Sequence, residues 1–170
     1  MVVLGIDPGY AIVGWGVISF NGVNYAPLGF GAITTDAGID FNLRLERIYD
    51  ELDLIIKQAK PDAMAIEKLY FQNNQKTAIN VAQARGVILL AAQKNNVPVF
   101  EYTPLQVKMA VTGYGQAKKP QIMEMTRRLL KLQAVPKPDD TADALAMAIT
   151  HTQAAGTNLK AMIFKRSLNS

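Results

Sequence analysis

Two acidic residues each end a short apolar segment of the chain. Asp7 follows residues 2–6, and Glu67 follows residues 63–66. Apolar runs of this length are typical of buried strands. If the two strands are parallel neighbours, both carboxylates emerge at the same edge of a sheet, where open α/β sheets usually bind ligands. Taken singly, Asp7 also fits the start of a Pro8-Gly9 turn, and Glu67 also fits an ordinary surface position.

A second acidic pair lies near the C-terminus. Asp140 and Asp143 are three residues apart in the expected first turn of the last helix, so they share one helix face. Acidic residues at a helix N-terminus also cap the helix and favour its dipole. That simpler explanation covers Asp139, Asp140 and Asp143 equally well.

Four carboxylates at one sheet edge would repel one another. A pair about 4 Å apart costs about 4 kcal/mol at an effective dielectric constant of about 20, so such a cluster is stable mainly around cations. The chain has no Cys and one His, which disfavours thiolate and zinc sites and favours Mg²⁺ or Mn²⁺ held by oxygen. Two such ions suit in-line attack of water on a phosphodiester, because one activates the nucleophile and the other stabilises the leaving oxygen.

Charge is unevenly distributed along the chain. Residues 1–67 hold four Lys/Arg and nine Asp/Glu, a net charge of −5, whereas residues 103–137 hold seven and one, a net charge of +6. A carboxylate site within a basic surround suggests a polyanionic partner. Basic runs are also common on solvated helix faces, so the charge pattern is weak support by itself.

The length of 170 residues fits one domain. No apolar run approaches the roughly 18 residues that a membrane span needs, and the first residues lack the basic region of a signal peptide. We therefore expect a cytoplasmic protein without membrane contact.

Strand patterns come first, and helices then alternate with strands. Short turns and apolar runs predict three antiparallel strands within residues 1–34, with a hairpin at Asn21-Gly22 and a bulge or edge near Pro27 and Gly29. Apolar residues recurring every three or four positions predict the helices. The expected later elements are helix 40–60, strand 62–67, helix 76–95, strand 97–100, a short helix from Thr103, helix 121–132 and helix 139–155.

This order of elements implies an α/β fold with a mixed five-stranded sheet flanked by helices, which is the ribonuclease H-like pattern. The folded domain is expected to span residues 1–155. Residues 156–170 show no clear period, and we expect them to form a mobile tail.

Five sequence blocks resemble the RuvC family of Holliday junction resolvases. They follow that family's order and spacing and cover residues 1 to about 153: LGIDPGYAIVGWGV, AIEKLYF, AQARGV, VFEYTPLQVK and DDTADALAMAITH. The resemblance implies a homodimeric, Mg²⁺-dependent crossover junction endodeoxyribonuclease with a ribonuclease H-like fold. It also implies two ions per active site, replaceable by Mn²⁺, and symmetrical paired nicks in four-way junction DNA during recombination and repair.

The resemblance assigns roles to individual acidic and aromatic residues. The family's catalytic and metal-binding positions fall on Asp7, Glu67, Asp140 and Asp143. The neighbouring Asp139 is then a capping residue, although it competes with Asp140 for the metal-binding role. Tyr70, with Phe71 beside it, matches an aromatic residue that stacks on an unpaired base, although burial under the sheet edge fits both rings too.

Basic residues receive DNA-binding roles from the same comparison. Lys108 and Lys119 match family positions near the scissile phosphates, and Lys118 competes with Lys119 for the inward-pointing role. Lys76 and Arg85 either contact DNA or are solvated.

Two other functions fit parts of the sequence. Sugar kinases, actin and heat-shock ATPases also begin with a strand, Asp and Gly, but they hold ATP between two such domains, and residues 103–170 show no second one. A catalytically inert junction-binding module would have the fold without the chemistry, yet all four acidic residues are present. A branch-migration motor complex is a candidate partner, and the Ala/Gly-rich helix 76–95 is a candidate dimer face.

Overall fold

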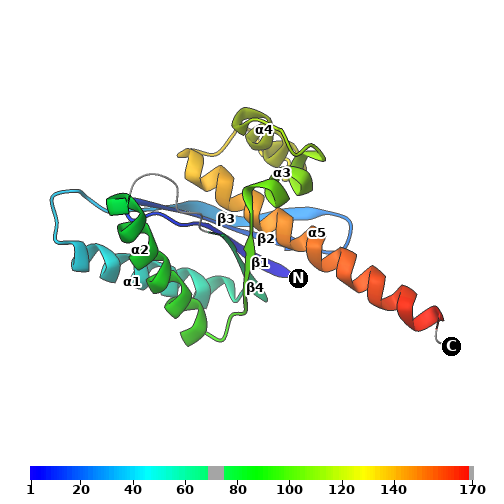
Figure 1. Cartoon of the computed structure of the whole chain (residues 1–170), viewed down its shortest axis with the longest axis horizontal. Coiled ribbons are helices and arrows are strands. Elements are labelled where there is room, and N and C mark those ends of the chain that lie inside the picture. The colour runs from blue at the N-terminus through cyan, green and yellow to red at the C-terminus, as the bar shows by residue number, and fades with distance from the viewer. Residues whose placement is uncertain (69–74, 169–170) are drawn as a thin grey trace.

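The computed structural model describes the backbone of residues 1–68 and 75–168, and the side chains within residues 1–68 and 77–156. Figure 1 shows one sheet with α1 and α2 on one side and α3, α4 and α5 on the other. The elements are β1 (Val2–Asp7), β2 (Ile12–Phe20), β3 (Tyr25–Thr34), α1 (Phe41–Ala59), β4 (Ala63–Glu67), α2 (Gln75–Lys94), β5 (Val99–Tyr102), α3 (Pro104–Thr112), α4 (Lys119–Leu129) and α5 (Asp139–Leu168).

The sheet has the order β3-β2-β1-β4-β5. The pairs β1–β2 and β2–β3 are antiparallel, whereas β1–β4 and β4–β5 are parallel. This confirms the mixed five-stranded sheet predicted from the sequence. The register between β2 and β3 shifts at Val17 and Ile18, opposite Pro27 and Gly29, which confirms the expected bulge.

Side chains of β1 alternate between the two helix layers. Leu4 and Ile6 belong to the core formed with α1 and α2, whereas Val3 belongs to the core formed with α5. The same alternation in β4 sends Met64 and Ile66 toward α1 and α2 and Ala65 toward α5. Asp7 shares the parity of Val3 and Gly5, and Glu67 shares that of Ala65, so both carboxylates face the α5 side.

Glycines let α5 lie directly against the sheet. A Cβ on Gly5 of β1 would overlap the carbonyl oxygen of Ala144 in α5, and a Cβ on Gly14 of β2 would overlap the carbonyl oxygen of Asp140. Thr141, fully buried, donates a hydrogen bond of 3.1 Å from Oγ1 to the Gly31 carbonyl oxygen of β3. The first turn of α5 is therefore fixed over the ends of three strands.

Several element boundaries differ from the expected ones. Helix α5 continues through Leu168 rather than ending near residue 155, and α4 begins at Lys119 rather than at Gln121. Strand β5 covers Val99–Tyr102, two residues later than expected. The predicted mobility of residues 156–170 stays a prediction. Within the described chain, no helix is both long enough and apolar enough to cross a bilayer.

We predict that Gly5→Ala destabilises the fold, because the added methyl group must push α5 away from β1. The expected loss in the free energy of unfolding is about 1–3 kcal/mol, the usual range for overpacking. Gly38→Ala is the matched control, since a Cβ there meets no atom within 4 Å, and it should change the value by less than about 0.5 kcal/mol. Urea denaturation measures both, and equal stabilities of the two variants would contradict the proposed helix–sheet contact.

Candidate active site

Strand register brings Asp7 and Glu67 together. Ile6 lies opposite Ile66 in the parallel β1–β4 pair. Asp7 and Glu67 are the next residues of those strands, so they lie side by side at the carboxyl edge. Both strands are central and their preceding residues are buried, which gives each carboxylate a rigid attachment.

Helix α5 adds two more carboxylates at the same edge. Asp140 and Asp143 lie in its first turns, above the point where Gly14 meets the helix backbone. Both residues raise the pKa of Asp7 through like-charge repulsion. The structure therefore brings together all four acidic residues that the sequence singled out.

Asp7 has the most perturbed carboxyl group of the four. Its pKa is raised from 3.8 to about 8, first by burial and then by repulsion from Asp143, Glu67 and Asp140. Burial and repulsion from Asp143 also raise the pKa of Glu67. A carboxylate that is both desolvated and surrounded by like charges needs a nearby cation to stay ionised at neutral pH.

Lys119 supplies part of the compensating charge. Its Nζ lies 2.8 Å from Oδ2 of Asp143 and 3.8 Å from Oδ2 of Asp139. The hydrogen bond to Asp143 raises the pKa of Lys119, whose charge in turn lowers the pKa of Asp7. Lys119 occupies this place because α4 begins there, with the backbone N–H of Lys118 donating to Oε1 of Gln121 at 2.8 Å.

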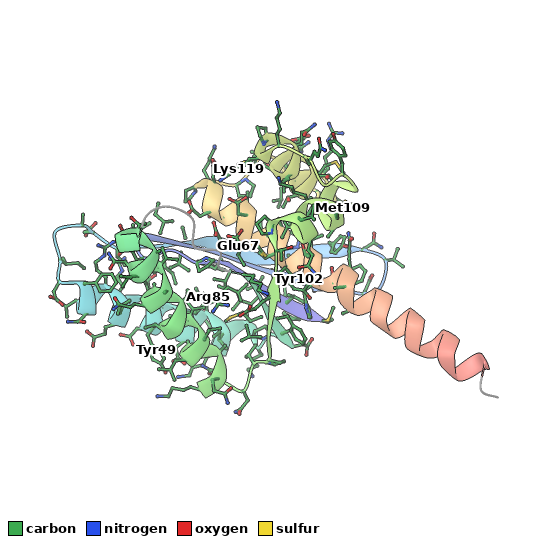
Figure 2. All side chains as sticks on the ribbon, in the orientation of Figure 1. Tyr49, Glu67, Arg85, Tyr102, Met109 and Lys119 are labelled. Carbon is green, nitrogen blue, oxygen red and sulfur yellow. The ribbon has the colours of Figure 1, made fainter. Side chains whose placement is uncertain are left out.

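A cavity of about 510 Å³ opens over the carboxylates. Figure 2 labels Glu67 and Lys119, which line it at the end of the sheet where α5 begins. Val107, Ile122 and Met147 form apolar parts of its wall. Its charged lining consists of Asp7, Glu67, Asp143, Lys108, Lys118 and Lys119.

The donor chemistry of the cavity fits a hard cation. Asp7, Glu67 and Asp143 line it and offer only carboxylate oxygens, which Mg²⁺ and Mn²⁺ prefer. Asp140 does not line the cavity, but its charge reaches Asp7. Among the described residues, no three Asp, Glu or His side chains are already close enough together to hold one ion. Asp143 instead directs Oδ2 toward Lys119, so this oxygen would have to leave Lys119 to bind a metal.

Comparison with known proteins identifies the family. The model of the family named crossover junction endodeoxyribonuclease RuvC matches residues 3–151. The protein of that name from Brevibacillus brevis is 56% identical over 153 residues, 90% of this chain and 92% of that protein. The one from Fusobacterium nucleatum is 52% identical over 159 residues, 94% of this chain and 84% of that protein. The chain belongs to the RuvC family.

Solved structures agree with this assignment. The structure of T. thermophilus RuvC in complex with Holliday junction substrate has a TM-score of 0.90 at 36% identity, over 93% of this chain and 96% of that chain. The yeast mitochondrial Holliday junction resolvase has a TM-score of 0.61 at 14% identity, over 87% of this chain and 76% of its own, and shares the fold. These likenesses confirm the ribonuclease H-like architecture.

The expected DNA-contacting residues fall into three groups. Lys108, Lys118 and Lys119 all line the cavity, and Lys119 is the lysine paired with Asp143. Tyr70 and Phe71, and the side chain of Lys76, lie outside the described residues. Arg85 forms an ion pair with Glu101 across α2 and β5, and its side chain is only 14% exposed.

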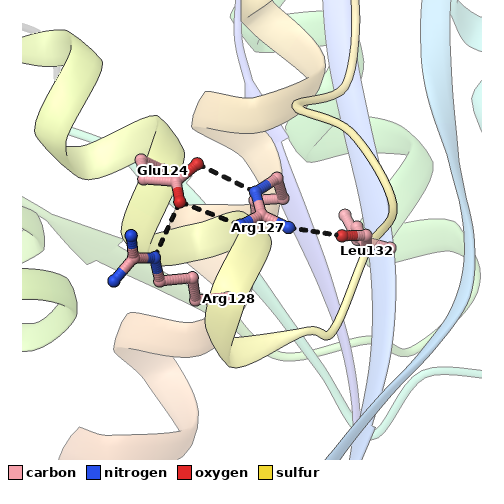
Figure 3. Close-up of polar contacts among 4 residues, drawn as sticks. All are labelled: Glu124, Arg127, Arg128 and Leu132. Carbon is pink, nitrogen blue, oxygen red and sulfur yellow. Dashed lines mark hydrogen bonds and ion pairs between the residues drawn. The ribbon is translucent and has the colours of Figure 1, made fainter.

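The basic stretch at 103–137 is partly neutralised within α4. Figure 3 shows Arg127 and Arg128 both reaching Glu124, at Nε–O distances of 2.8 and 2.7 Å. Their hydrogen bonds, that of Arg127 first, lower the pKa of Glu124 to about 2. Arg127 also donates from Nη1 to the Leu132 carbonyl oxygen at 2.9 Å, so it stabilises the turn after α4. The lysines that line the cavity are therefore better candidates for phosphate binding than Arg127 and Arg128.

Some residues that build the site were not singled out by sequence reasoning. Gly5 and Gly14 lie inside predicted strands, and glycine in a strand is a known signal of close backbone approach. The single histidine, His151, is buried in α5 and hydrogen-bonds the Tyr102 hydroxyl through Nδ1 at 2.8 Å. It thereby ties α5 to β5 beside the cavity, and no sequence pattern pairs the two residues.

We predict that the metal-free protein loses stability as pH rises from about 4 to about 8. The folded protein holds the Asp7 proton up to a pKa of about 8, whereas the ordinary value is 3.8. Between these values the folded state binds more protons than the unfolded state, so this group lowers stability by at most about 1.4 kcal/mol per pH unit. Asp7→Asn should therefore stabilise the protein more at pH 8 than at pH 5.

Urea denaturation with EDTA at both pH values measures this difference. Asp36→Asn changes an exposed carboxylate in the loop before α1 and should leave the pH dependence unaltered. If the stability of Asp7→Asn depended on pH as that of the wild type does, the raised pKa of Asp7 would be contradicted.

Proposed function

We propose that this chain is an endonuclease that resolves four-way DNA junctions by hydrolysing one phosphodiester in each of two strands. The single observation that carries this is Asp7, a buried carboxylate that shares a cavity with Glu67 and Asp143 and with the lysines around them. Carboxylates inside a basic surround fit a polyanionic substrate. The T. thermophilus relative, whose structure was solved with a Holliday junction substrate, shares the fold over 96% of its chain.

Metal binding is assigned to Asp7, Glu67, Asp140 and Asp143, with two Mg²⁺ ions per site and Mn²⁺ as a substitute. A positive charge beside Asp7 offsets both causes of its raised pKa, burial and repulsion. Two bound ions supply activation of water and stabilisation of the leaving oxygen during in-line displacement. The chain's own part is to hold ionised oxygens on two rigid strands and one rigid helix, so that little reorganisation is needed.

The lysines of the cavity are assigned to the DNA backbone. Lys119 releases Asp143 for metal binding and then pairs with a phosphate oxygen, which is an exchange of one anionic partner for another. Lys108 and Lys118 line the same cavity and extend the positive surface along the strand. Tyr70, with Phe71, is assigned to stacking on a base at the crossover, which is worth about 1–3 kcal/mol per base. Lys76 is assigned to a nearby phosphate.

The dimer is proposed to form through the outer face of α2. Ile79 and Leu90 on that helix are 58% and 52% exposed. Gly86 lies between them, and a Cβ there meets no atom within 4 Å, so nothing among the described residues accounts for a glycine in mid-helix. A second copy of α2 crossing at Gly86 would cover both apolar side chains and place two active sites around one two-fold axis.

Bacterial relatives with a DNA substrate support the cytoplasm as the site of action. A branch-migration motor complex stays a predicted partner, and no surface is assigned to it.

We predict that Asp7→Asn abolishes cleavage and preserves junction binding. Loss of the central carboxylate should lower the cleavage rate at least about 100-fold, the size expected for one preorganised electrostatic contact, while phosphate contacts that dominate affinity remain. Incubation with a synthetic four-way junction and Mg²⁺ measures paired nicks, and gel shift without Mg²⁺ measures binding.

Asp36→Asn is the control, because Asp36 is an exposed carboxylate in the loop before α1 and is not among the groups that shift the pKa of Asp7. It should cleave within about twofold of the wild-type rate, since a surface substitution away from the site changes free energies by less than about 0.5 kcal/mol. Normal cleavage by Asp7→Asn would refute the assignment of Asp7. Binding without cleavage by the wild type would favour the inert-module alternative.

We predict that Leu90→Arg converts the dimer into a monomer, because it introduces a charge into the proposed apolar contact. Leu54→Arg is the control, since Leu54 is similarly exposed, at 56% against 52% for Leu90, but lies on α1 and not on α2. Sedimentation velocity should give a dimer for wild type and Leu54→Arg and a monomer for Leu90→Arg. A monomeric wild type, or a dimeric Leu90→Arg, would contradict the α2 interface.

A further inference from the structure

Arg44 is a buried arginine without an acidic partner. It lies in the first turn of α1, and only 7% of the residue is exposed. Its Nε and Nη2 donate hydrogen bonds to neutral oxygens only, and among the described residues no carboxylate oxygen lies within 4.0 Å of its guanidinium. A guanidinium keeps its charge, so this burial has a desolvation cost that no ion pair offsets.

The hydrogen bonds of Arg44 converge on one backbone carbonyl. Nη2 donates to the Tyr10 carbonyl oxygen at 3.1 Å, and Nε donates to Oγ1 of Thr35 at 2.8 Å. The Thr35 hydroxyl donates a hydrogen bond of 2.6 Å to the same Tyr10 oxygen. The guanidinium carbon also lies 4.9 Å from the centre of the Tyr10 ring, so the cation holds both the backbone and the ring of Tyr10.

Tyr10 belongs to the turn that directly follows Asp7. The turn is tight, because a Cβ on Gly9 would overlap the carbonyl oxygen of Ile12. Its far end is fixed by a hydrogen bond of 2.9 Å from the Thr35 backbone N–H to the Ala11 carbonyl oxygen. The turn is thus clamped from α1 and from the end of β3, while Asp7 projects to the opposite face, toward α5.

An apolar side chain of similar volume would fill this space without burying a charge, and such replacements of buried ions are often neutral or stabilising. An arginine offers a rigid fork of donors that reaches two acceptors at once. Here the fork joins three elements: α1, the residue after β3 and the turn after β1. The guanidinium holds the backbone beside Asp7 through these hydrogen bonds, which an apolar side chain could not form.

We propose that Arg44, acting with the Thr35 hydroxyl, is a positioning residue that fixes the turn after Asp7 and thereby sets the place of the Asp7 carboxylate for metal binding. The proposal rests on the proposed function, in which Asp7 binds Mg²⁺. Neither residue touches substrate or metal. Their effect therefore appears as a weaker response to Mg²⁺ and a lower turnover, with junction binding unchanged.

Thr35→Val and Thr35→Ser form the sharpest pair of variants. Valine keeps the shape of threonine and removes the hydroxyl that joins Arg44 to Tyr10, whereas serine keeps that hydroxyl. Arg44→Lys keeps the charge and removes the fork. Arg47→Lys is the control on the same helix, because Arg47 is exposed and pairs with Glu51 at 2.7 Å.

Three measurements separate positioning from a general loss of stability. The first is the Mg²⁺ concentration that gives half of the Mg²⁺-induced rise in the unfolding temperature, measured without DNA. The second is hydrogen exchange of the backbone amide of residue 35. The third is kcat and KM for cleavage of a four-way junction.

Thr35→Val and Arg44→Lys should each raise the half-maximal Mg²⁺ concentration about 10-fold and lower kcat about 10- to 100-fold, the range typical of groups that support metal ligands. KM should stay within about twofold, since phosphate contacts dominate affinity, and exchange at residue 35 should accelerate. Thr35→Ser and Arg47→Lys should match the wild type in all three.

An unchanged Mg²⁺ midpoint in both Thr35→Val and Arg44→Lys would overturn the proposal, even if their unfolding temperatures fall. Equal shifts in Thr35→Ser and Thr35→Val would overturn it too, because the hydroxyl would then be irrelevant. If Asp7→Asn responds to Mg²⁺ like the wild type, the proposed function itself fails, and that result is distinct from either of the others.

Discussion

The site depends on the contact between the backbone of α5 and the glycines of β1 and β2. With no side chain at Gly5 or Gly14, the helix lies against the strands, and the carbonyl oxygens of Ala144 and Asp140 take the space that a Cβ would need. This contact sets the height of Asp140 and Asp143 above the sheet edge. The register of β1 with β4 independently sets Asp7 beside Glu67. The helix–sheet contact and the strand register therefore position the carboxylates at the same edge of the sheet.

This convergence is electrostatically unfavourable in the protein alone. Asp7 is buried and repelled by three carboxylates, and Lys119 offsets part of that charge. The packing of the helix on the sheet provides the stability that keeps the like charges together, as is common at sites that bind cations or charged substrates. The same arrangement explains why Lys119 is close to Asp143: the ammonium group compensates charge that a metal ion would compensate under the proposed function.

Much of this arrangement is visible in the sequence because it follows from local patterns. The apolar runs that end in Asp7 and Glu67 predict two strands and the edge that they share, and the spacing of Asp140 and Asp143 predicts a common helix face. What the patterns do not contain is long-range packing. Lys119, and not Lys118, forms the ion pair with Asp143. This pairing depends on α4 beginning at Lys119, two residues earlier than its apolar period indicates. The clamp of Arg44 on Tyr10 joins residues 34 positions apart, and helical periodicity assigns Arg44 only to α1.

The central claim is that Asp7 is the shared ligand that joins the sheet to α5 through bound cations. Anomalous diffraction from crystals of the metal-free protein soaked in Mn²⁺ tests it most directly, because Mn²⁺ scatters anomalously and accepts the same oxygen ligands as Mg²⁺. We expect anomalous peaks within about 2.0–2.3 Å of an Asp7 oxygen, between that carboxylate and those of Glu67, Asp140 and Asp143. Peaks confined to other surfaces, or a fully loaded site without Asp7 among its ligands, would contradict it.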